Sequence, residues 1–446
     1  MTKDLTVGKP SKIILDFTLP IFAGNIFQQF YSMADTVIVG KFVGNEALAA
    51  VGACGTLMFL ILGFLLGMTA GFTVVTSQHY GAGNMKAMRQ SVTSAAVLSA
   101  AVSIAMTVLS MTFMKRILHL MNTPPDMYAQ AYDYIMVICG GIAAQVLYNL
   151  LASILRALGD SKRPLFFLII AAGLNIVLDL VFIIAFHMGA AGAAWATVVS
   201  QGVSGMLCLI YIIFRVPELH LSRGDWKINW SLAKWQMRIG FPMAFQYSIT
   251  AIGTIIVQTA LNSLGSVAAA GFAAANKIEQ IVTQAYVALG TTISTYCAQN
   301  VGAGEEERVR QGFKSATWIG VIYAVVTGVV IALAGKYMAP LFVSENVNVI
   351  MGYVDIYLKC VSLFFIPLVV VNVYRNGIQG MGYGLLPMMA GIAELAGRTA
   401  AAVAGAYFKS FTGICLASPA AWVLAGGLLI AMYRGIMKRR KKLQKV

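Results

Sequence analysis

Apolar stretches long enough to cross a bilayer recur along the whole chain, and no other feature limits the fold so strongly. An α-helix rises about 1.5 Å per residue, so about twenty apolar residues cross a hydrocarbon core roughly 30 Å thick. The stretches are continuously apolar, which favours helices over barrel strands, because a helix satisfies its own backbone within the membrane. We expect twelve spans, at residues 13–40, 47–77, 92–113, 128–153, 165–186, 190–214, 235–262, 267–298, 315–338, 349–374, 386–408 and 412–433.

The composition agrees with this interpretation. Hydrophobic residues make up 59% of the 446 residues and charged residues 11%, and the mean hydropathy is +0.77, far outside the range of soluble domains. The predicted fold class is therefore an all-α polytopic membrane protein with twelve transmembrane helices. The six cysteines lie in or beside apolar spans without a C-x-x-C spacing, so we expect core residues and not disulfides or metal ligands.

Lysine and arginine predict the orientation of the chain. The net charge of +15 raises the question of a nucleic-acid partner, but the basic residues gather in alternate loops. With the N-terminus inside, and with Arg238 and Lys336 at span ends counted with the adjacent loops, 24 of the 32 fall in inner loops and tails and five in outer loops; Lys277, Lys359 and Arg398 lie well within spans. The positive-inside rule then places both termini on the cytoplasmic side of a plasma (inner) membrane. We expect no nucleic-acid partner.

The sequence offers little for an enzyme. The four histidines lie at loop or helix ends without ligand spacing, and no nucleophile motif or phosphate-binding loop is present. We expect no catalytic residues and no organic cofactor. Residues 1–10 lead into a span far longer than the apolar core of a signal peptide, so the first helix is expected to be retained.

The two halves of the chain resemble each other. A proline lies inside the first apolar helix of each half, Pro20 in FTLPIF and Pro242 in IGFPMAF. SQHYGAGNMKAMRQSVTSA matches AQNVGAGEEERVRQGFKSA, and LRALGDSKRP matches IQGMGYGLLP, at offsets between 219 and 223 residues. Each half holds six spans, so both insert with the same orientation, related by a pseudo-twofold axis along the membrane normal. We expect an amino-terminal six-helix lobe at 1–214, a cytoplasmic linker at 215–234, a carboxy-terminal six-helix lobe at 235–433 and a basic cytoplasmic tail at 434–446. Two such lobes suit alternating access, and the duplication disfavours a receptor or a static channel.

Four acidic residues fall well within spans: Asp35, Asp179, Glu279 and Glu394. An ionised carboxylate there costs several kcal/mol unless a cation, water or partner compensates, so each is a candidate functional residue. Glu394 has Arg398 four residues later, which favours a structural ion pair. Glu279 follows Lys277 by two residues, so it could form a local ion pair with Lys277 or line the ion pathway, and the sequence leaves both open.

Helical spacing groups the other two acids with neutral polar residues. Gln28, Tyr31 and Asp35 share one face of the first span, and Asn175 and Asp179 share a face of the fifth. Asp179 and Thr197 lie at similar depth, roughly 13 Å below the outer end of their helices. Oxygen-bearing side chains from three helices can therefore meet at one level, as an ion site or as a satisfied hydrogen-bond cluster.

Together these features resemble the multidrug and toxic compound extrusion (MATE) family over the whole chain. The resemblance rests on the duplicated halves, on LPIFAGNIFQQFYSMADTVIVGKFVGNEALAAVG, on the G-A-G loops and on LRALGDSKRP before NIVLD. It implies a two-lobed exporter of cationic amphipathic compounds that exchanges them for Na⁺ or H⁺. It places an ion site, with Na⁺ as a possible metal, on Asp35, Asn175, Asp179 and Thr197, with Gln28, Tyr31 and Asn149 along the cavity and Pro20 as a kink. A second branch of the family has carboxylates on the seventh and tenth helices, and here Gln246 follows Pro242 and IPLVVVNVYRNG has none.

We therefore expect a secondary active antiporter that acts as a monomer in the lipid bilayer on organic cations. A flippase for a lipid-linked or anionic substrate is the alternative within transport, and it would need a cavity rich in Arg and Lys. An ion channel or a membrane enzyme is the alternative outside transport.

Overall fold

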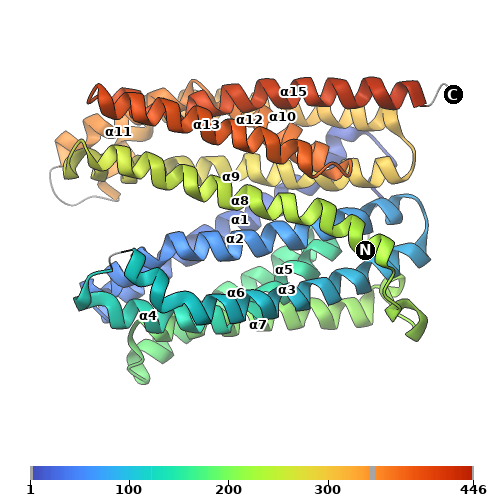
Figure 1. Cartoon of the computed structure of the whole chain (residues 1–446), viewed down its shortest axis with the longest axis horizontal. Coiled ribbons are helices and arrows are strands. Elements are labelled where there is room, and N and C mark those ends of the chain that lie inside the picture. The colour runs from blue at the N-terminus through green and yellow to red at the C-terminus, as the bar shows by residue number, and fades with distance from the viewer. Residues whose placement is uncertain (1–3, 122, 342–346, 444–446) are drawn as a thin grey trace. The chain divides into compact units, whose positions relative to one another are not determined.

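The structure is a computed structural model that describes residues 4–121, 123–341 and 347–443, and these ranges are helical without a β-strand (Figure 1). The long helices are α1 (Pro10–Phe42), α2 (Asn45–Gly81), α3 (Met85–Leu120), α4 (Pro125–Gly140), α5 (Ile142–Ala157), α6 (Lys162–Leu180), α7 (Gly189–Arg215), α8 (Trp230–Asn262), α9 (Ser266–Gly302), α10 (Glu306–Ala334), α11 (Val347–Ser362), α12 (Phe365–Gly380), α13 (Leu385–Tyr407) and α15 (Ala417–Leu443). The short elements are η1 (Val181–Ala185), η2 (Pro217–Leu219), η3 (Arg223–Trp226), η4 (Gly335–Leu341) and α14 (Phe411–Cys415).

These helices account for the twelve predicted spans. By length and composition, eight of the described helices can cross a membrane, or up to ten if each of two bent pairs forms one span. The pairs are α4 with α5, bent by 47°, and α11 with α12, bent by 53°. The remaining two long helices are α9 with 37 residues, which carries Glu279, and α13 with 23, which carries Glu394. The fold is an all-α, twelve-helix, two-lobed membrane protein.

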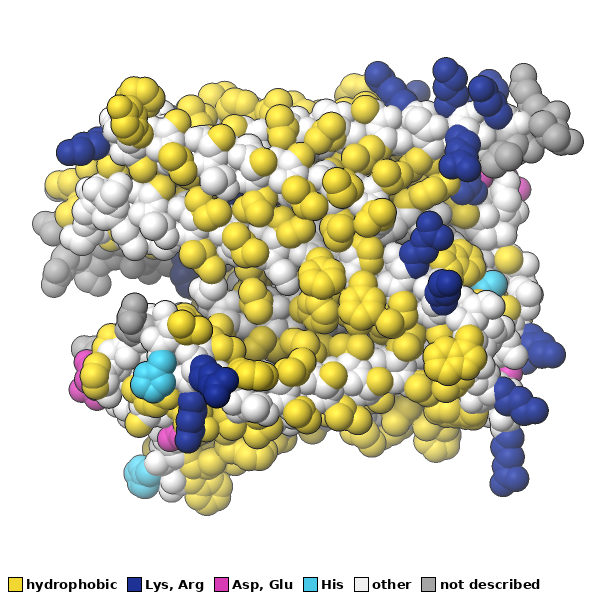
Figure 2. Space-filling model, in the orientation of Figure 1, with side chains coloured by type: hydrophobic (Ala, Val, Ile, Leu, Met, Phe, Trp, Pro, Cys, Tyr) yellow, Lys and Arg dark blue, Asp and Glu magenta, His cyan; other side chains and the backbone are white. Residues whose placement is uncertain are grey.

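The outer faces of the helices are apolar. On α10, Trp318, Ile322, Val326 and Val330 follow one another at four-residue spacing and are 56% to 61% exposed. Such a stripe on a helix surface is unfavourable in water and favourable against lipid. Figure 2 shows apolar side chains over the sides of the helices and Lys and Arg near helix ends. These apolar sides suit contact with lipid.

Chain contacts divide the described residues into two compact units. Unit 1 comprises Met1–Thr6, Leu19–Tyr247 and Gly302–Gly304, and unit 2 comprises Val7–Thr18, Ser248–Val301 and Glu305–Val446. Helices α1 and α8 therefore each contribute to both units. The division of α1 falls beside Pro20, and that of α8 falls five residues after Pro242.

The packing inside the two units repeats, as the duplicated sequence predicts. In unit 1, α7 packs on α5 and α6, and α3 packs on α4 and α5 (Figure 1). In unit 2, α15 packs on α12 and α13, and α10 packs on α11 and α12. The turns repeat too: Gly83 and Gly304 of the G-A-G loops have φ of 68° and 77°, a left-handed conformation that favours glycine.

The linker is ordered and packs on α3 of unit 1. Ser222 donates hydrogen bonds of 2.8 Å from both its backbone N–H and its hydroxyl to Asp225, and Arg89 of α3 lies 3.4 Å from the same carboxylate. The hydrogen bonds from Ser222 and the charge of Arg89 hold the pKa of Asp225 below its ordinary value. Helix α8 begins at Trp230, inside the predicted linker, because the hydropathy pattern follows the bilayer and not the helix.

Candidate functional site

Three helices of unit 1 bring the predicted polar residues into the protein interior. Asp35 lies on α1, Asn175 and Asp179 lie on α6, and Thr197 lies on α7. Asp179 is fully buried, Asn175 is 2% exposed, and Asp35 and Thr197 are each 9% exposed. The carboxylates of Asp35 and Asp179 lie near enough for their charges to interact. Two acids of like charge, one on α1 and one on α6, therefore lie close together within the apolar part of unit 1.

Two of these residues, Asn175 and Thr197, line a small cavity, and neither Asp35 nor Asp179 is among its lining side chains. Its lining side chains come from α1, α6 and α7: Tyr31, Leu168, Ala171, Ala172, Asn175, Thr197, Ser200 and Gln201. Its volume is about 10 Å³, near the lower limit of the space that one water molecule needs. The cavity thus has room for a small ion or water and none for an organic compound.

Several polar atoms of the cavity lining and of the two acids have no hydrogen-bond partner among the described residues. They are both carboxylate oxygens of Asp179, one carboxylate oxygen of Asp35, both amide atoms of Asn175, the Ser200 hydroxyl and the Gln201 carbonyl oxygen. Buried polar groups are normally hydrogen-bonded, and an unpaired buried group loses its solvation without compensation. Carboxylate, amide and hydroxyl oxygens are the ligands that hard cations prefer. This donor set suits a small cation or a proton.

The helix that carries Asp179 changes its winding directly after the site. Helix α6 ends at Leu180, and residues Val181–Ala185 continue as a π-helical turn. Such turns are rare within helices and are frequent at functional sites, because they leave a backbone that is less tightly determined.

The structure assigns different surroundings to the other predicted site residues. Tyr31 lines the cavity, and Gln28 lies within hydrogen-bonding reach of its hydroxyl. Asn149 of α5 is half-buried and is not among the side chains that line the cavity. Pro20 lies inside α1, fifteen residues before Asp35, or roughly 22 Å along the axis.

Sequence reasoning missed two polar residues of α7. Ser200 and Gln201 line the cavity, and Gln201 lies within hydrogen-bonding reach of Tyr31. They follow Thr197 by three and four residues, so they share its face of the helix. That spacing was a usable signal, but neutral polar residues are common in these helices and the motif alone did not single them out.

Unit 2 holds the other two intramembrane acids in a network of charges. Glu394 of α13 accepts hydrogen bonds from Arg398, at 2.8 Å, and from Arg375 of α12. The predicted Glu394–Arg398 pair is confirmed. Arg375 lies one residue beyond the predicted span 349–374, on α12, which continues to Gly380. Glu279 of α9 accepts a hydrogen bond from the Tyr357 hydroxyl of α11.

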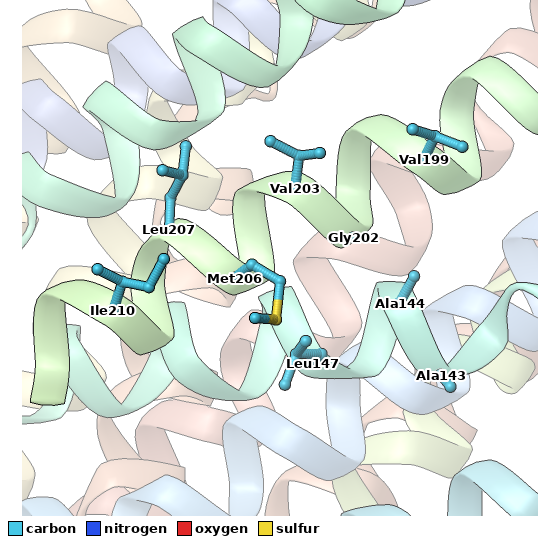
Figure 3. Close-up of a pocket in the computed structure, with 9 residues that line it drawn as sticks. All are labelled: Ala143, Ala144, Leu147, Val199, Gly202, Val203, Met206, Leu207 and Ile210. Atoms are coloured by element: carbon cyan, nitrogen blue, oxygen red, sulfur yellow. The ribbon is translucent and has the colours of Figure 1, made fainter.

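An apolar groove lies between α5 and α7 on the outside of unit 1. Figure 3 shows that its walls are aliphatic, with Ala143, Ala144 and Leu147 on α5 and Val199, Gly202, Val203, Met206, Leu207 and Ile210 on α7. Met206 and Ile210 are each 48% exposed, so the groove faces outward. It has no polar side chain that would bind an ion.

Known proteins resemble this chain in sequence and in fold. It is 32% identical over 392 residues to the "Probable multidrug resistance protein YpnP" of Bacillus subtilis (strain 168), with 86% of each chain covered. It is 22% identical to the "FAD transporter" of Shewanella oneidensis, over 93% of this chain and 92% of that one. The structure described as "Crystal structure of MATE in complex with MaL6" has a TM-score of 0.93 at 22% identity and covers 99% of this chain and 100% of that chain, which shows a shared fold. The MatE family model matches residues 20–181 and 242–397, one stretch in each half and well over half of the sequence. The chain therefore belongs to the MatE family of multi-pass membrane transporters and is not an enzyme.

Proposed function

We propose that this protein is a secondary active antiporter that exports cationic, amphipathic organic compounds in exchange for Na⁺ or H⁺. The coupling ion would bind at Asp35, Asn175, Asp179 and Thr197. The observation that carries this proposal is the pair of buried, mutually close carboxylates with unpaired oxygens and no basic partner among the described residues. Two like charges in a medium of low dielectric constant require a proton or a cation.

This requirement supplies the coupling. An organic cation that enters the same lobe competes with the inorganic ion for the two carboxylates, so the two loaded states exclude each other. Exchange follows because reorientation of the empty transporter, with both carboxylates uncompensated, is unfavourable. The neutral oxygens of Asn175 and Thr197 would complete the shell of a sodium ion and would matter less for a proton. Gln28, Tyr31 and Asn149 are proposed to line the path of the organic substrate.

The names of the relatives support export of organic compounds and leave two candidate substrate classes. The Bacillus relative is named a multidrug resistance protein, which supports organic cations. The Shewanella relative is named an FAD transporter, which favours an anionic solute as the second candidate. Proteoliposomes under separately imposed Na⁺ and pH gradients decide between them. Counterflow of a cationic dye driven by either gradient supports the first candidate, and gradient-driven FAD flux without dye flux supports the second.

We further propose that residues 1–214 and 235–433 form the two lobes, that the protein acts as a monomer, and that both termini are cytoplasmic.

A cysteine in each G-A-G loop tests the orientation. Ala82→Cys and Ala303→Cys, both at exposed positions in a background without the six native cysteines, should stay unlabelled by an impermeant thiol reagent added to intact cells. Lys409→Cys in a predicted outer loop is the matched control and should be labelled. Labelling of the G-A-G positions from outside would reverse the assignment.

We propose that Pro20 lets α1 bend during the cycle. Proline removes one backbone hydrogen bond and so lowers the cost of bending a helix. Pro20→Ala should slow efflux by roughly an order of magnitude, as a barrier higher by about 1.4 kcal/mol would produce, with drug binding and abundance retained. Dye efflux rates per amount of inserted protein measure this. Efflux at the parent rate would leave Pro20 without a role in transport.

A further inference from the structure

The internal repeat gives Asp35, Asn175 and Asp179 of the proposed ion site counterparts in unit 2. Helices α6 and α13 begin at Lys162 and Leu385, which are 223 residues apart. Pro164 and Pro387 are separated by the same number of residues. The same offset takes Asn175 to Arg398. The offset of 222 that relates the two prolines of the first helices takes Tyr31 to Gly253 and Asp35 to Val257. The offset of 223 takes Asp179 to Ala402, so the counterparts of both acids are apolar.

The sizes of two facing side chains are exchanged between the halves. In unit 1, Tyr31 and Asn175 both line the small cavity, a large residue facing a small one. In unit 2, a Cβ atom added to Gly253 would lie 2.8 Å from Nη1 of Arg398. The guanidinium therefore occupies the space that a side chain at position 253 would fill. A cationic group fills the place that corresponds to the cavity beside the candidate ion site.

Acids that unit 1 lacks surround this guanidinium. Arg398 donates to Glu394 at 2.8 Å, and its charge also acts on Glu279. Arg375 donates to the other carboxylate oxygen of Glu394, and Tyr357 donates to Glu279. Two carboxylates and two guanidinium groups from α9, α12 and α13 therefore balance each other without an added ion.

The contacts behind the two sites also correspond. In unit 1, the Tyr134 hydroxyl of α4 lies 3.4 Å from the sulfur of Met58 on α2. Tyr357 follows Tyr134 by 223 residues, and Glu279 follows Met58 by 221, the offset of the G-A-G loops. Tyr357 bonds Glu279 as Tyr134 contacts Met58. Unit 2 thus keeps the arrangement and replaces a neutral contact with an acid that faces a resident cation.

We propose that Arg398 is a built-in cation, which takes in unit 2 the position that an exchangeable ion takes in unit 1. The proposal rests on the ion site proposed above, and it predicts that the second half binds no coupling ion. Because Arg398 occupies this position, only the site in unit 1 would exchange an ion in each transport cycle. Removing its charge should open a cation site among Glu279 and Glu394.

Thermal unfolding of Arg398→Gln in an Asp179→Asn background tests this. Millimolar guanidinium chloride, and NaCl in a second series, should raise the midpoint by a few °C, because a ligand bound only by the folded state stabilises it by mass action. Arg398→Lys keeps a cation and should not respond. Glu279→Gln/Arg398→Gln removes one charge of each sign and should also not respond. A folded Arg398→Gln protein that responds to neither cation would overturn the proposal.

Two further measurements keep the test decisive. If Arg398→Gln does not accumulate, the neutral double variant should accumulate near the parent level, whereas a purely steric role of Arg398 would leave the double variant equally poor. Equilibrium binding of ²²Na⁺ to Asp179→Asn protein that disappears in Asp179→Asn/Glu279→Gln would show an exchangeable ion in unit 2 and contradict the inference. Failure of the ion site proposed for unit 1 would give a different result. Ion binding and coupled efflux would then survive in Asp179→Asn and also in Asp179→Asn/Glu279→Gln.

Discussion

Replacement of Asp179 by asparagine is expected to abolish ion-driven efflux while the protein still inserts. The side chain is fully buried and close to the charge of Asp35, and neither of its oxygens has a partner among the described residues. Asparagine keeps the size and removes the negative charge, so one carboxylate remains and no cation is required to balance a pair. Coupling between two sites usually amounts to about 1–3 kcal/mol, or about 5- to 150-fold in affinity. The effect of the ion on drug affinity, a factor of that size, should therefore disappear, and ion-driven efflux should be lost with it.

Efflux of a cationic dye from proteoliposomes, normalised to inserted protein, measures the loss. Glu307→Gln is the control, because Glu307 lies at the exposed start of α10, 3.8 Å from Arg310. An exposed ion pair contributes little, and this variant should transport normally. Asp35→Asn should behave as Asp179→Asn does. Ordinary dependence on the ion gradient in a well-inserted Asp179→Asn protein would exclude the proposed site.

Glu394→Gln is expected to lower stability far more than it alters coupling. The carboxylate is 7% exposed and is shared by two guanidinium groups, Arg375 and Arg398. Its removal leaves two buried positive charges against the single charge of Glu279. Loss of one partner from a buried ion pair typically costs about 3–5 kcal/mol, because the remaining charge is left unsolvated. The unfolding midpoint and the amount of monodisperse protein should both fall.

The control for this variant is Glu307→Gln at the start of α10. Glu307 is exposed and lies 3.8 Å from Arg310, so its replacement should change the free energy of unfolding by less than about 0.5 kcal/mol. Restoring balance in Glu394→Gln/Arg398→Gln should recover part of the lost stability. An unchanged midpoint in Glu394→Gln would mean that the network around Arg398 does not hold these helices together.

The sequence specified the helices well and their ends less well. The predicted span 92–113 lies inside α3, which runs from Met85 to Leu120, and the predicted span 13–40 lies inside α1. Hydropathy marks only the part of a helix that lies in the hydrocarbon, while backbone hydrogen bonds continue into the polar turns at each end. The bends between α4 and α5 and between α11 and α12 have no such signal, because each pair is one apolar stretch.

Much of the candidate site followed from spacing within single helices. The 3.6-residue period put Asn175 and Asp179 on one face, and depth from the helix ends put Thr197 at their level. The structure brings Tyr31, Asn175 and Thr197 to one cavity. Which face of a helix meets which neighbour depends on the rotation of each helix, and single-helix spacing does not contain that information.

By itself, then, the sequence determined the membrane class, the twelve spans, the duplication and the family, because hydropathy, charge in loops and repeat matches are local properties that read directly along the chain. Beyond the Glu394–Arg398 pair, only the tertiary structure decided which intramembrane charges compensate one another. Arg375 of α12 pairs with Glu394 of α13, and the charge of Arg398 also acts on Glu279 of α9. Asp35 and Asp179 act on each other through their charges and have no basic partner among the described residues. Electrostatic compensation depends on distances of a few ångström between helices far apart in sequence, so it is fixed by packing and not by the pattern along the chain.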